Sequence, residues 1–348
     1  MARRRRLASR ATRRWLVAAC AGGALTCGGG RAPGAPSSSG PPASGVAGTI
    51  VRVVDGTPIA GATIQVRDRS AVSSASGQFS LSAPVGAGQT ISVFAPGYLR
   101  HDLSLAVGRS GLRISMIPDS QPFSLGFYRQ FARNAHDSPL DLAAIDRWTI
   151  APRFYIRTTV DDTGVSVPDG IVARIVTVIR RSVPELSAGR FEAAAIETGT
   201  VARPVAAGWV IVTFSRDLGG RILGQATVGG NSGVLQLRYD PEAPDVIPDD
   251  PRGCGDTVVS VAEHEITHTM GFRHTVNEPD DFHSIPAAGC TGAPRPEHVR
   301  YHAAVAYSRP PGNLDVDVDP LDAPSLGAPA GGRPAVLVSC GAELFGRR

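Results

Sequence analysis

The chain has 348 residues and a formal net charge of +4, and 42% of its residues are hydrophobic and 19% charged. This balance excludes a fully disordered chain and one that is membrane-spanning throughout, and the length can hold two ordinary domains. All 35 basic residues are arginine, and eight of them lie in the first 31 residues, which contain no Asp or Glu. The rest of the chain has 27 arginines and 31 acidic residues, so it is mildly acidic and we expect no nucleic-acid partner.

Residues 1–27 predict an export signal. A basic stretch ends at Arg14, and the apolar residues 15–25 that follow have the length of a signal-peptide core but are too short to span a membrane. The segment around the arginine pair is similar to a twin-arginine signal. Cys20 or Cys27 offers an attachment point for a lipid, and secretion without a lipid is the alternative. In both cases we expect an exported protein, extracellular, periplasmic or held at the cell surface, that meets a membrane only through an N-terminal lipid anchor.

A linker and a small β domain follow the signal. Residues 28–46 are mostly Gly, Pro, Ser and Ala and predict a flexible linker. Residues 47–118 alternate apolar and polar residues between turn signals, with strands expected at 49–54, 62–67, 77–81 and 90–94, which indicates an all-β sandwich. The recurring turn and strand residues are Gly56, Pro58, Gly61, Ala62, Ile64, Val66, Gly77, Phe79, Leu81, Gly97 and Tyr98. This pattern resembles the carboxypeptidase regulatory-like, transthyretin-type domain, and the resemblance implies a non-catalytic accessory.

Residues 119–348 have a mixed pattern that predicts an α+β domain, with a C-terminal tail from about residue 309. We expect a strand at 148–158, a helix at 170–183 behind a cap at Asp169, a buried strand at 208–215, and two strands at 222–228 and 234–238 joined by a Gly-rich turn. Residues 121–146 are interpreted as the remnant of a prosegment; they contain no Cys, which excludes a thiolate switch there.

The segment that carries chemistry is residues 264–274, which read His-Glu-Ile-Thr-His-Thr-Met-Gly-Phe-Arg-His. The apolar spacing before it predicts a helix, on which His264 and His268, four residues apart, share one face. Gly271 can adopt the backbone conformation that ends a helix, so the chain can turn and bring His274 back as a third ligand. Five such fixed positions arise by chance in a chain of this composition with a probability on the order of 10⁻⁵.

Three neutral imidazoles suit one catalytic Zn²⁺ ion, because a fourth position stays open for water. Glu265 directly follows the first candidate ligand and is placed to accept a proton from that water, whose pKa zinc lowers to about 7. Zinc also polarises the carbonyl of a peptide bond, and Glu265 can then pass the proton to the leaving amine. The motif therefore predicts peptide-bond hydrolysis without a covalent intermediate.

The motif HExxHxxGxxH, with Thr275 after the third His, resembles the metzincin metallopeptidases and within them the matrixin branch, over residues 145–308. The resemblance implies a twisted mixed sheet and a zinc helix, with 222–228 as the edge strand above the cleft. Main-chain groups of an extended substrate would then pair with Leu223, Gly224, Gln225 and Ala226. The family also has a Met-containing turn beneath the zinc. The candidate here, residues 302–308, has Ala306 in the place of that Met, which puts the rigidity of the site in doubt more than metal binding. Tyr307 beside it is either a packed aromatic or an additional ligand or oxyanion donor.

Several other polar residues allow two interpretations each. A disulfide between Cys254 and Cys290 would bracket the zinc helix, leaving Cys340 buried or paired otherwise. The alternating aspartates could hold Ca²⁺ or form a solvated acidic loop. Three histidines that follow the motif are either a second metal site or ordinary core or solvated histidines. The residues concerned are Asp315, Asp317 and Asp319 for calcium, and His283, His298 and His302 for the second metal.

These observations together predict a secreted or surface-tethered zinc-dependent endopeptidase, a monomer that acts on a peptide or protein substrate with Glu265 as general base. The alternative is a surface adhesion or binding module whose peptidase fold holds zinc with little or no activity. Ala306 and the accessory β domain suggest that alternative.

Overall fold

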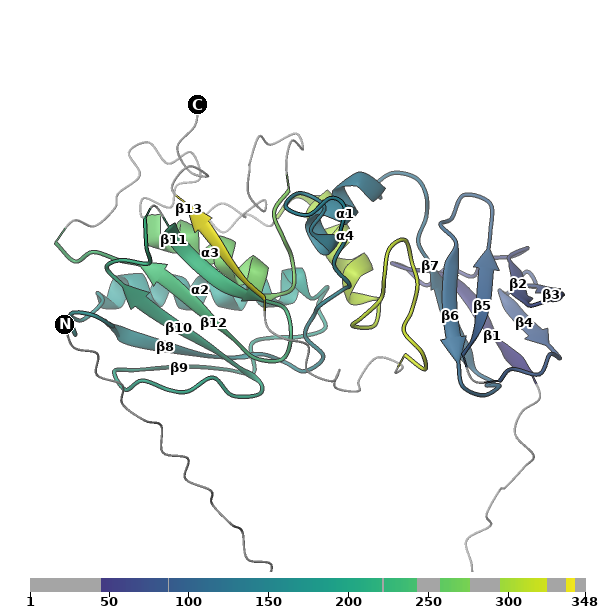
Figure 1. Cartoon of the computed structure of the whole chain (residues 1–348), viewed down its shortest axis with the longest axis horizontal. Helices are drawn as coiled ribbons and strands as arrows, with labels where there is room; N and C mark the ends of the chain where they lie inside the picture. Colours follow the sequence, from purple (N-terminus) through teal and green to yellow (C-terminus); the bar gives the residue numbers. More distant parts are fainter. Residues whose placement is uncertain are drawn as a thin grey trace, which may run out of the picture. The chain divides into compact units, whose positions relative to one another are not determined.

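The computed structural model describes residues 45–86, 88–220, 222–242, 257–275, 295–323 and 336–341 (Figure 1). The predicted export signal, residues 28–44 of the predicted linker, and Cys254, His283 and Cys290 lie outside the described residues. None of the described helices combines the length and the apolar character that crossing a membrane requires. The described elements make an α+β fold, as the sequence predicts.

The N-terminal part of the described chain consists of two sheets around one apolar core. Along β2, β4 and β6 buried and more exposed residues alternate, because successive side chains of a strand point to opposite faces. The sequence pattern predicts four of the seven strands and misses the short, mostly exposed β3 as well as β6 and β7. The first sheet has the order β4-β1-β7 and the second β3-β2-β5-β6, with bounds β1 Val46–Arg52, β2 Thr63–Val66, β3 Arg69–Val72, β4 Gln78–Leu81, β5 Gln89–Phe94, β6 His101–Leu105 and β7 Leu112–Met116.

The second part is built on a six-stranded mixed sheet. Its order is β13-β11-β12-β10-β8-β9, with bounds β8 Arg153–Val160, β9 Ala195–Gly199, β10 Trp209–Ser215, β11 Ile222–Val228, β12 Gly233–Arg238 and β13 Val336–Gly341. Four strands, β9, β8, β10 and β12, run parallel, and β11 is antiparallel to both of its neighbours. Parallel strands need crossovers, and the helix between β8 and β9 supplies one.

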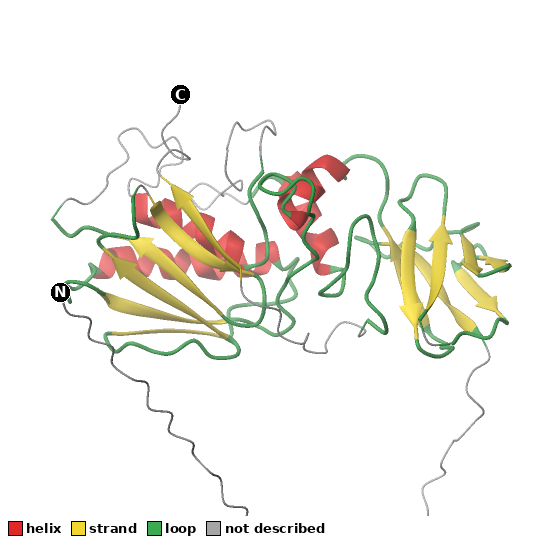
Figure 2. Cartoon of the chain, viewed as in Figure 1, coloured by secondary structure: helices red, strands yellow, loops and turns green. Residues whose placement is uncertain are grey.

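Two long helices lie on the same side of this sheet, behind it in the view of Figure 2. Helix α2, Asp169–Leu186, buries the apolar face that the spacing predicts, but the residue before it, Pro168, takes the cap position. Asp169 lies in the first turn instead, where its negative charge interacts favourably with the helix dipole. Helix α3, Thr257–Thr269, packs against α2, β11 and β12 and carries the histidine motif.

The segment before β8 and the helix α4 complete the core. Helix α1, Leu125–Arg133, begins at Ser124, whose hydroxyl accepts a hydrogen bond from the Phe127 amide. Phe131 of α1 stacks on Phe272, shortly after the end of α3, with ring centroids 4.1 Å apart. Residues 121–146 therefore contribute buried side chains to the core of this part of the chain. Helix α4, Glu297–Tyr307, covers the segment in which a Met-type turn is expected, so Ala306 lies in a helical turn.

The position of β11 differs from the prediction. The family resemblance implies that 222–228 is an edge strand, whereas β13 pairs with its outer side, so β11 has a strand on each side. In Figure 1 β13, drawn in yellow, runs along β11. The prediction fails here because residues 336–341 are a short apolar run in a Gly- and Pro-rich tail, and such a run forms a strand only when it meets a partner.

Candidate metal centre

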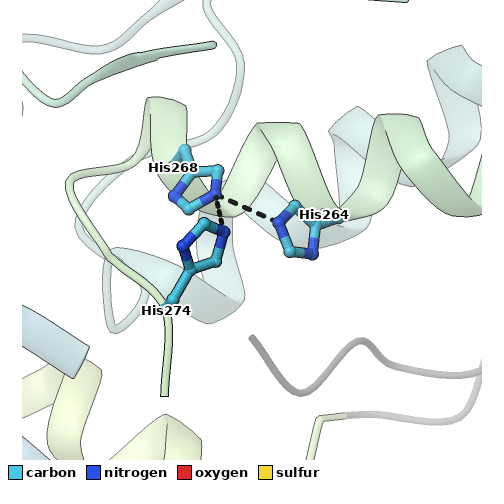
Figure 3. A group of neighbouring side chains, drawn as sticks. All are labelled: His264, His268 and His274. Atoms are coloured by element: carbon cyan, nitrogen blue, oxygen red, sulfur yellow. Dashed lines mark hydrogen bonds between the residues drawn. The ribbon is translucent and has the colours of Figure 1, made fainter. Parts of the chain in front are cut away.

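Three histidines of the motif converge on one point (Figure 3). His264 and His268 come from successive turns of α3, and His274 comes from the extended chain after it. The Nε2 atoms of His264 and His268 are 3.1 Å apart, and those of His268 and His274 are 3.2 Å apart. Nitrogen ligands that are about 2.0–2.1 Å from one tetrahedral ion lie about 3.3 Å from each other. All three side chains are buried, and the group could hold a metal ion.

The turn between the second and third histidines depends on a glycine. Gly271 has φ = +103°, and a Cβ there would collide with the carbonyl oxygen of Asp146. A side chain would therefore be strained by the backbone conformation and would also push away the chain that precedes the first strand of the sheet. This close approach lets the chain reverse and return His274 to the ion site.

Groups from distant parts of the chain satisfy the carbonyls at the end of α3, which have no partner within the helix. The Trp148 indole donates to the carbonyl of Thr269 at 2.7 Å, the Tyr307 hydroxyl donates to that of Met270 at 2.9 Å, and the Gly229 amide donates to that of His268 at 3.1 Å. Tyr307 is fully buried, and burial raises the pKa of its phenol. It is therefore the packed aromatic of the two interpretations, and it fixes the helix end that presents the histidines.

The ring orientations of two histidines are set by groups behind them. Nδ1 of His268 lies 2.8 Å from the Phe272 carbonyl oxygen, and a carbonyl only accepts, so Nδ1 carries the proton and Nε2 keeps its lone pair for an ion. Burial, and then the charge of His274, lowers the pKa of His268 to about 3, which keeps the ring neutral. Nδ1 of His274 faces the Asp137 carboxylate at 3.4 Å.

Asp137 is a site residue that the sequence does not reveal. It follows α1, and hydrogen bonding to His274 is the largest cause of its lowered pKa. Because 137 positions separate it from His274, no local spacing signals the contact. Carboxylates in this position orient a ligating histidine and raise its basicity.

Glu265, the expected general base, is buried on α3 against β11. A Cβ built on Gly224 would lie 2.6 Å from Oε1 of Glu265 and 2.5 Å from a methyl carbon of Val261. The strand can approach the carboxylate this closely only because residue 224 is a glycine. The structure thus brings Gly224, one of the four residues expected to bind substrate, next to Glu265, and Leu223, Gln225 and Ala226 continue the same strand.

The back of α3 is held by a buried ion-pair network. Glu263, next to His264 in sequence, accepts from Arg181 of α2 at 2.6 Å and lies 3.5 Å from Arg295. Arg295 also pairs with Glu185 of α2 at 2.8 Å and donates to the Thr267 hydroxyl at 3.3 Å. The sequence does not predict this network, which ties the histidine helix to α2.

The acidic run after α4 has cationic partners. Asp315 accepts two hydrogen bonds from Arg129, at 3.0 and 2.8 Å. Asp317 accepts two from Arg309, each at 2.6 Å. Asp317 and Asp319 also contact His101 of β6, at 2.9 and 3.3 Å. Since positive side chains already neutralise these carboxylates, they do not suit Ca²⁺, which needs six to eight oxygen ligands around itself.

The remaining candidates are structural or lie outside the described residues. His302 is buried against Phe123 and Phe127, its Nε2 accepts from the Ser124 amide at 2.9 Å, and burial lowers its pKa to about 4. It is therefore a neutral core histidine. His283 and the expected Cys254–Cys290 pair fall outside the described residues, and Cys340 lies in β13.

Comparisons with known proteins add no family. No protein-family model matches the chain, and no curated protein matches it. Among solved structures, short parts of the chain are similar to two type II cohesin–X-dockerin complexes from Acetivibrio cellulolyticus, an N-terminal and a C-terminal interface mutant. Sequence identities are 23% and 19%, TM-scores 0.19 and 0.18, and coverage 22% and 24% of this chain. The chain spans 58% and 66% of the length of those chains. TM-scores this low carry no information about the site.

Proposed function

We propose that the chain is an exported zinc-dependent endopeptidase of metzincin-like, matrixin-like type. The observation that carries the proposal is the convergence of three buried imidazole Nε2 atoms beside a buried glutamate that directly follows the first of them. Three neutral nitrogen ligands are typical of catalytic zinc, which keeps a further position for water and substrate. Export is supported by residues 1–27, and the motif His264-Glu265-x-x-His268-x-x-Gly271-x-x-His274 supports the peptidase family.

His264, His268 and His274 would hold the ion, which supplies a Lewis acid that polarises the scissile carbonyl and lowers the pKa of water to about 7. Glu265 accepts the proton of the attacking water and delivers it to the nitrogen of the leaving amine as the C–N bond breaks. Water thus adds its oxygen to the acyl carbon and its hydrogens to the two products. Gly224 lets the backbone of β11 lie against Glu265, so an extended peptide along β11 has its main chain beside the general base.

The test compares purified chain with Glu265→Gln, using a peptide library read by mass spectrometry together with metal analysis. We expect one zinc per wild-type chain, chelator-sensitive cleavage, and a loss of cleavage of at least about 100-fold in Glu265→Gln with unchanged zinc, because the general base is gone while all three ligands remain. Glu297→Gln, at an exposed glutamate that begins α4, is the matched control and keeps full activity. Undiminished cleavage by Glu265→Gln would contradict the role of Glu265 as general base.

A second candidate, a zinc-holding surface binding module, is favoured by β13, which already occupies the outer side of β11. Under that proposal the wild-type chain carries one zinc ion and cleaves no peptide in the library, with or without the residues that form β13. Cleavage of any library peptide that is lost in Glu265→Gln rejects it.

A further inference from the structure

We propose that residues 336–341 of the chain are an internal competitor for the substrate-binding edge, and that a peptide substrate reaches β11 only when this strand leaves. This inference rests on the proposed peptidase function, which it extends to the regulation of the same site. The occupant of the edge is thus a segment of the chain itself, bound in the manner of an extended peptide.

The register of β13 supports this assignment. β13 is antiparallel to β11 and pairs Gly224 with Cys340, Gln225 with Ser339 and Ala226 with Val338, then continues to Val228 opposite Val336. Three of the four residues expected to bind substrate are therefore paired with β13, and the fourth, Leu223, lies at the irregularity between Ile222 and Gly224. A substrate strand and β13 cannot use the same backbone groups of β11 at once.

The pairing also passes the general base. Gly224 is the point at which β11 touches Glu265, and the same residue is opposite Cys340. Neighbouring strands are about 4.8 Å apart, so the backbone of β13 runs one strand spacing from the strand that touches the carboxylate. A segment bound here has the position of a peptide lying across the reacting centre.

β13 has the features of a strand that can be exchanged. It has six residues, and in the described part of the chain it pairs with β11 alone. Half of the Leu337 surface is exposed, so this apolar side chain gains little from burial. The residues that join it to the preceding described segment, 324–335, are mostly Gly, Pro and Ala. A tethered strand acts at an effective concentration in the millimolar range, so it competes with free peptides for the same backbone groups of β11.

The test uses three variants of the full chain. One ends at Ala323, one replaces residues 336–341 by an equally long Gly-Ser segment, and the control makes the same replacement in residues 342–347. Binding is measured with the labelled peptide Val-Leu-Val-Ser-Ser-Gly, in which Ser stands for Cys340, and cleavage is measured with the library substrates. Zinc content and cooperative melting establish that each variant is folded.

We expect the first two variants to keep one zinc, to bind the peptide at least about tenfold more tightly than the wild-type chain, and to cleave with a kcat/KM raised at least about tenfold, while the control matches the wild type. Equal binding and equal cleavage in all chains overturn the inference and leave the peptidase proposal standing. Loss of zinc and of cooperative melting in both β13 variants also overturns it, because β13 is then a permanent strand of the sheet. Tight peptide binding without any cleavage supports competition at the edge and rejects the peptidase.

Discussion

Asp137 connects the metal centre to a part of the chain far from the histidine motif. Its carboxylate faces Nδ1 of His274 at 3.4 Å, and the hydrogen bond to His274 is the main cause of its lowered pKa. Removing the charge while keeping the shape, in Asp137→Asn, should weaken zinc binding about 10- to 100-fold, since the imidazole loses both orientation and basicity. Competition with a chelator of known affinity measures this change.

The matched control for this prediction is Asp141→Asn, at an exposed aspartate of the same segment. It should leave the zinc affinity at the wild-type value. An Asp137→Asn chain that holds zinc as tightly as the control would show that His274 is positioned by the Gly271 turn alone.

At the scale of elements, helix α3 depends on a buried charge network for its place against α2. Arg295 is fully buried between Glu185 and Glu263, and burial lowers the pKa of its guanidinium. Replacing it in Arg295→Met removes one of the cations that neutralise Glu263, which is itself buried. We expect a loss of about 3 kcal/mol in the free energy of unfolding, measured by denaturant titration, because breaking a buried pair leaves an uncompensated charge.

Arg180→Met, on the exposed side of α2, tests whether the loss belongs to the network. A surface arginine contributes little, so the control should change the unfolding free energy by less than about 1 kcal/mol. A similar small change in Arg295→Met would mean that Arg181 alone neutralises Glu263.

The elements differ in how far the sequence predicts them. Strands β10 and β11 follow from short, largely apolar segments between turn signals and are buried on both faces. Strand β12 and helix α2 each have one buried face that recurs with the period of the element. The three metal-ligand candidates follow from spacing too, since a helix turn and one glycine fix their geometry locally. Helix α1 has a local signal of the same kind, the Ser124 cap before apolar residues at helical spacing, which the prediction missed. Asp137 could not be predicted in this way, because the stacking of Phe131 on Phe272 that places its segment joins residues 141 positions apart. The Met-type turn at 302–308 was wrong because Ala306 and its neighbours continue the helix α4.

At the scale of the whole molecule, the chain after α4 returns to the N-terminal β domain. The Asp102 amide of β6 donates to the Asp317 carbonyl at 3.0 Å, and the Asp319 amide donates to the Asp102 carbonyl at 2.8 Å. His101 beside them contacts both carboxylates. Burial alone would lower the pKa of His101, but the charge of Asp317 and hydrogen bonds to Asp317 and Asp319 outweigh both burial and Arg309 and raise it to about 9.

This raised pKa predicts a pH dependence of stability in the alkaline range. A histidine whose pKa rises from about 6.5 to about 9 on folding stabilises the fold fully below pH 6.5, and the contribution is lost as the pH rises through 9. The melting temperature of the wild-type chain should therefore fall between pH 6.5 and 9.5, and the free energy of unfolding should fall by about 1–3 kcal/mol over this range. In His101→Gln this fall should be much smaller.

Asp317 provides the complementary check. Its pKa is lowered by Arg309 and then by His101, against burial, so its contribution is present above its ordinary pKa and is lost only in acid. Because the charge of Asp317 is the main cause that raises the pKa of His101, Asp317→Asn should also remove the fall in melting temperature at alkaline pH, as His101→Gln does. A wild-type melting temperature that stays constant from pH 6.5 to 9.5 would contradict the assigned protonation of His101.

The distribution of the metal centre along the chain bears on the order in which it assembles. His264 and His274 are ten positions apart, whereas Asp137 precedes His274 by 137 positions. Loop closure costs more entropy for the longer separation, by about 2 kcal/mol on a logarithmic scale. A helix with its following turn can therefore bind an ion early in folding. The Asp137 carboxylate, which orients His274, takes its place only when residues 121–146 have packed. Under the proposed function we therefore expect firm retention of the ion only in a completely folded chain, and we expect local opening of that segment to release it.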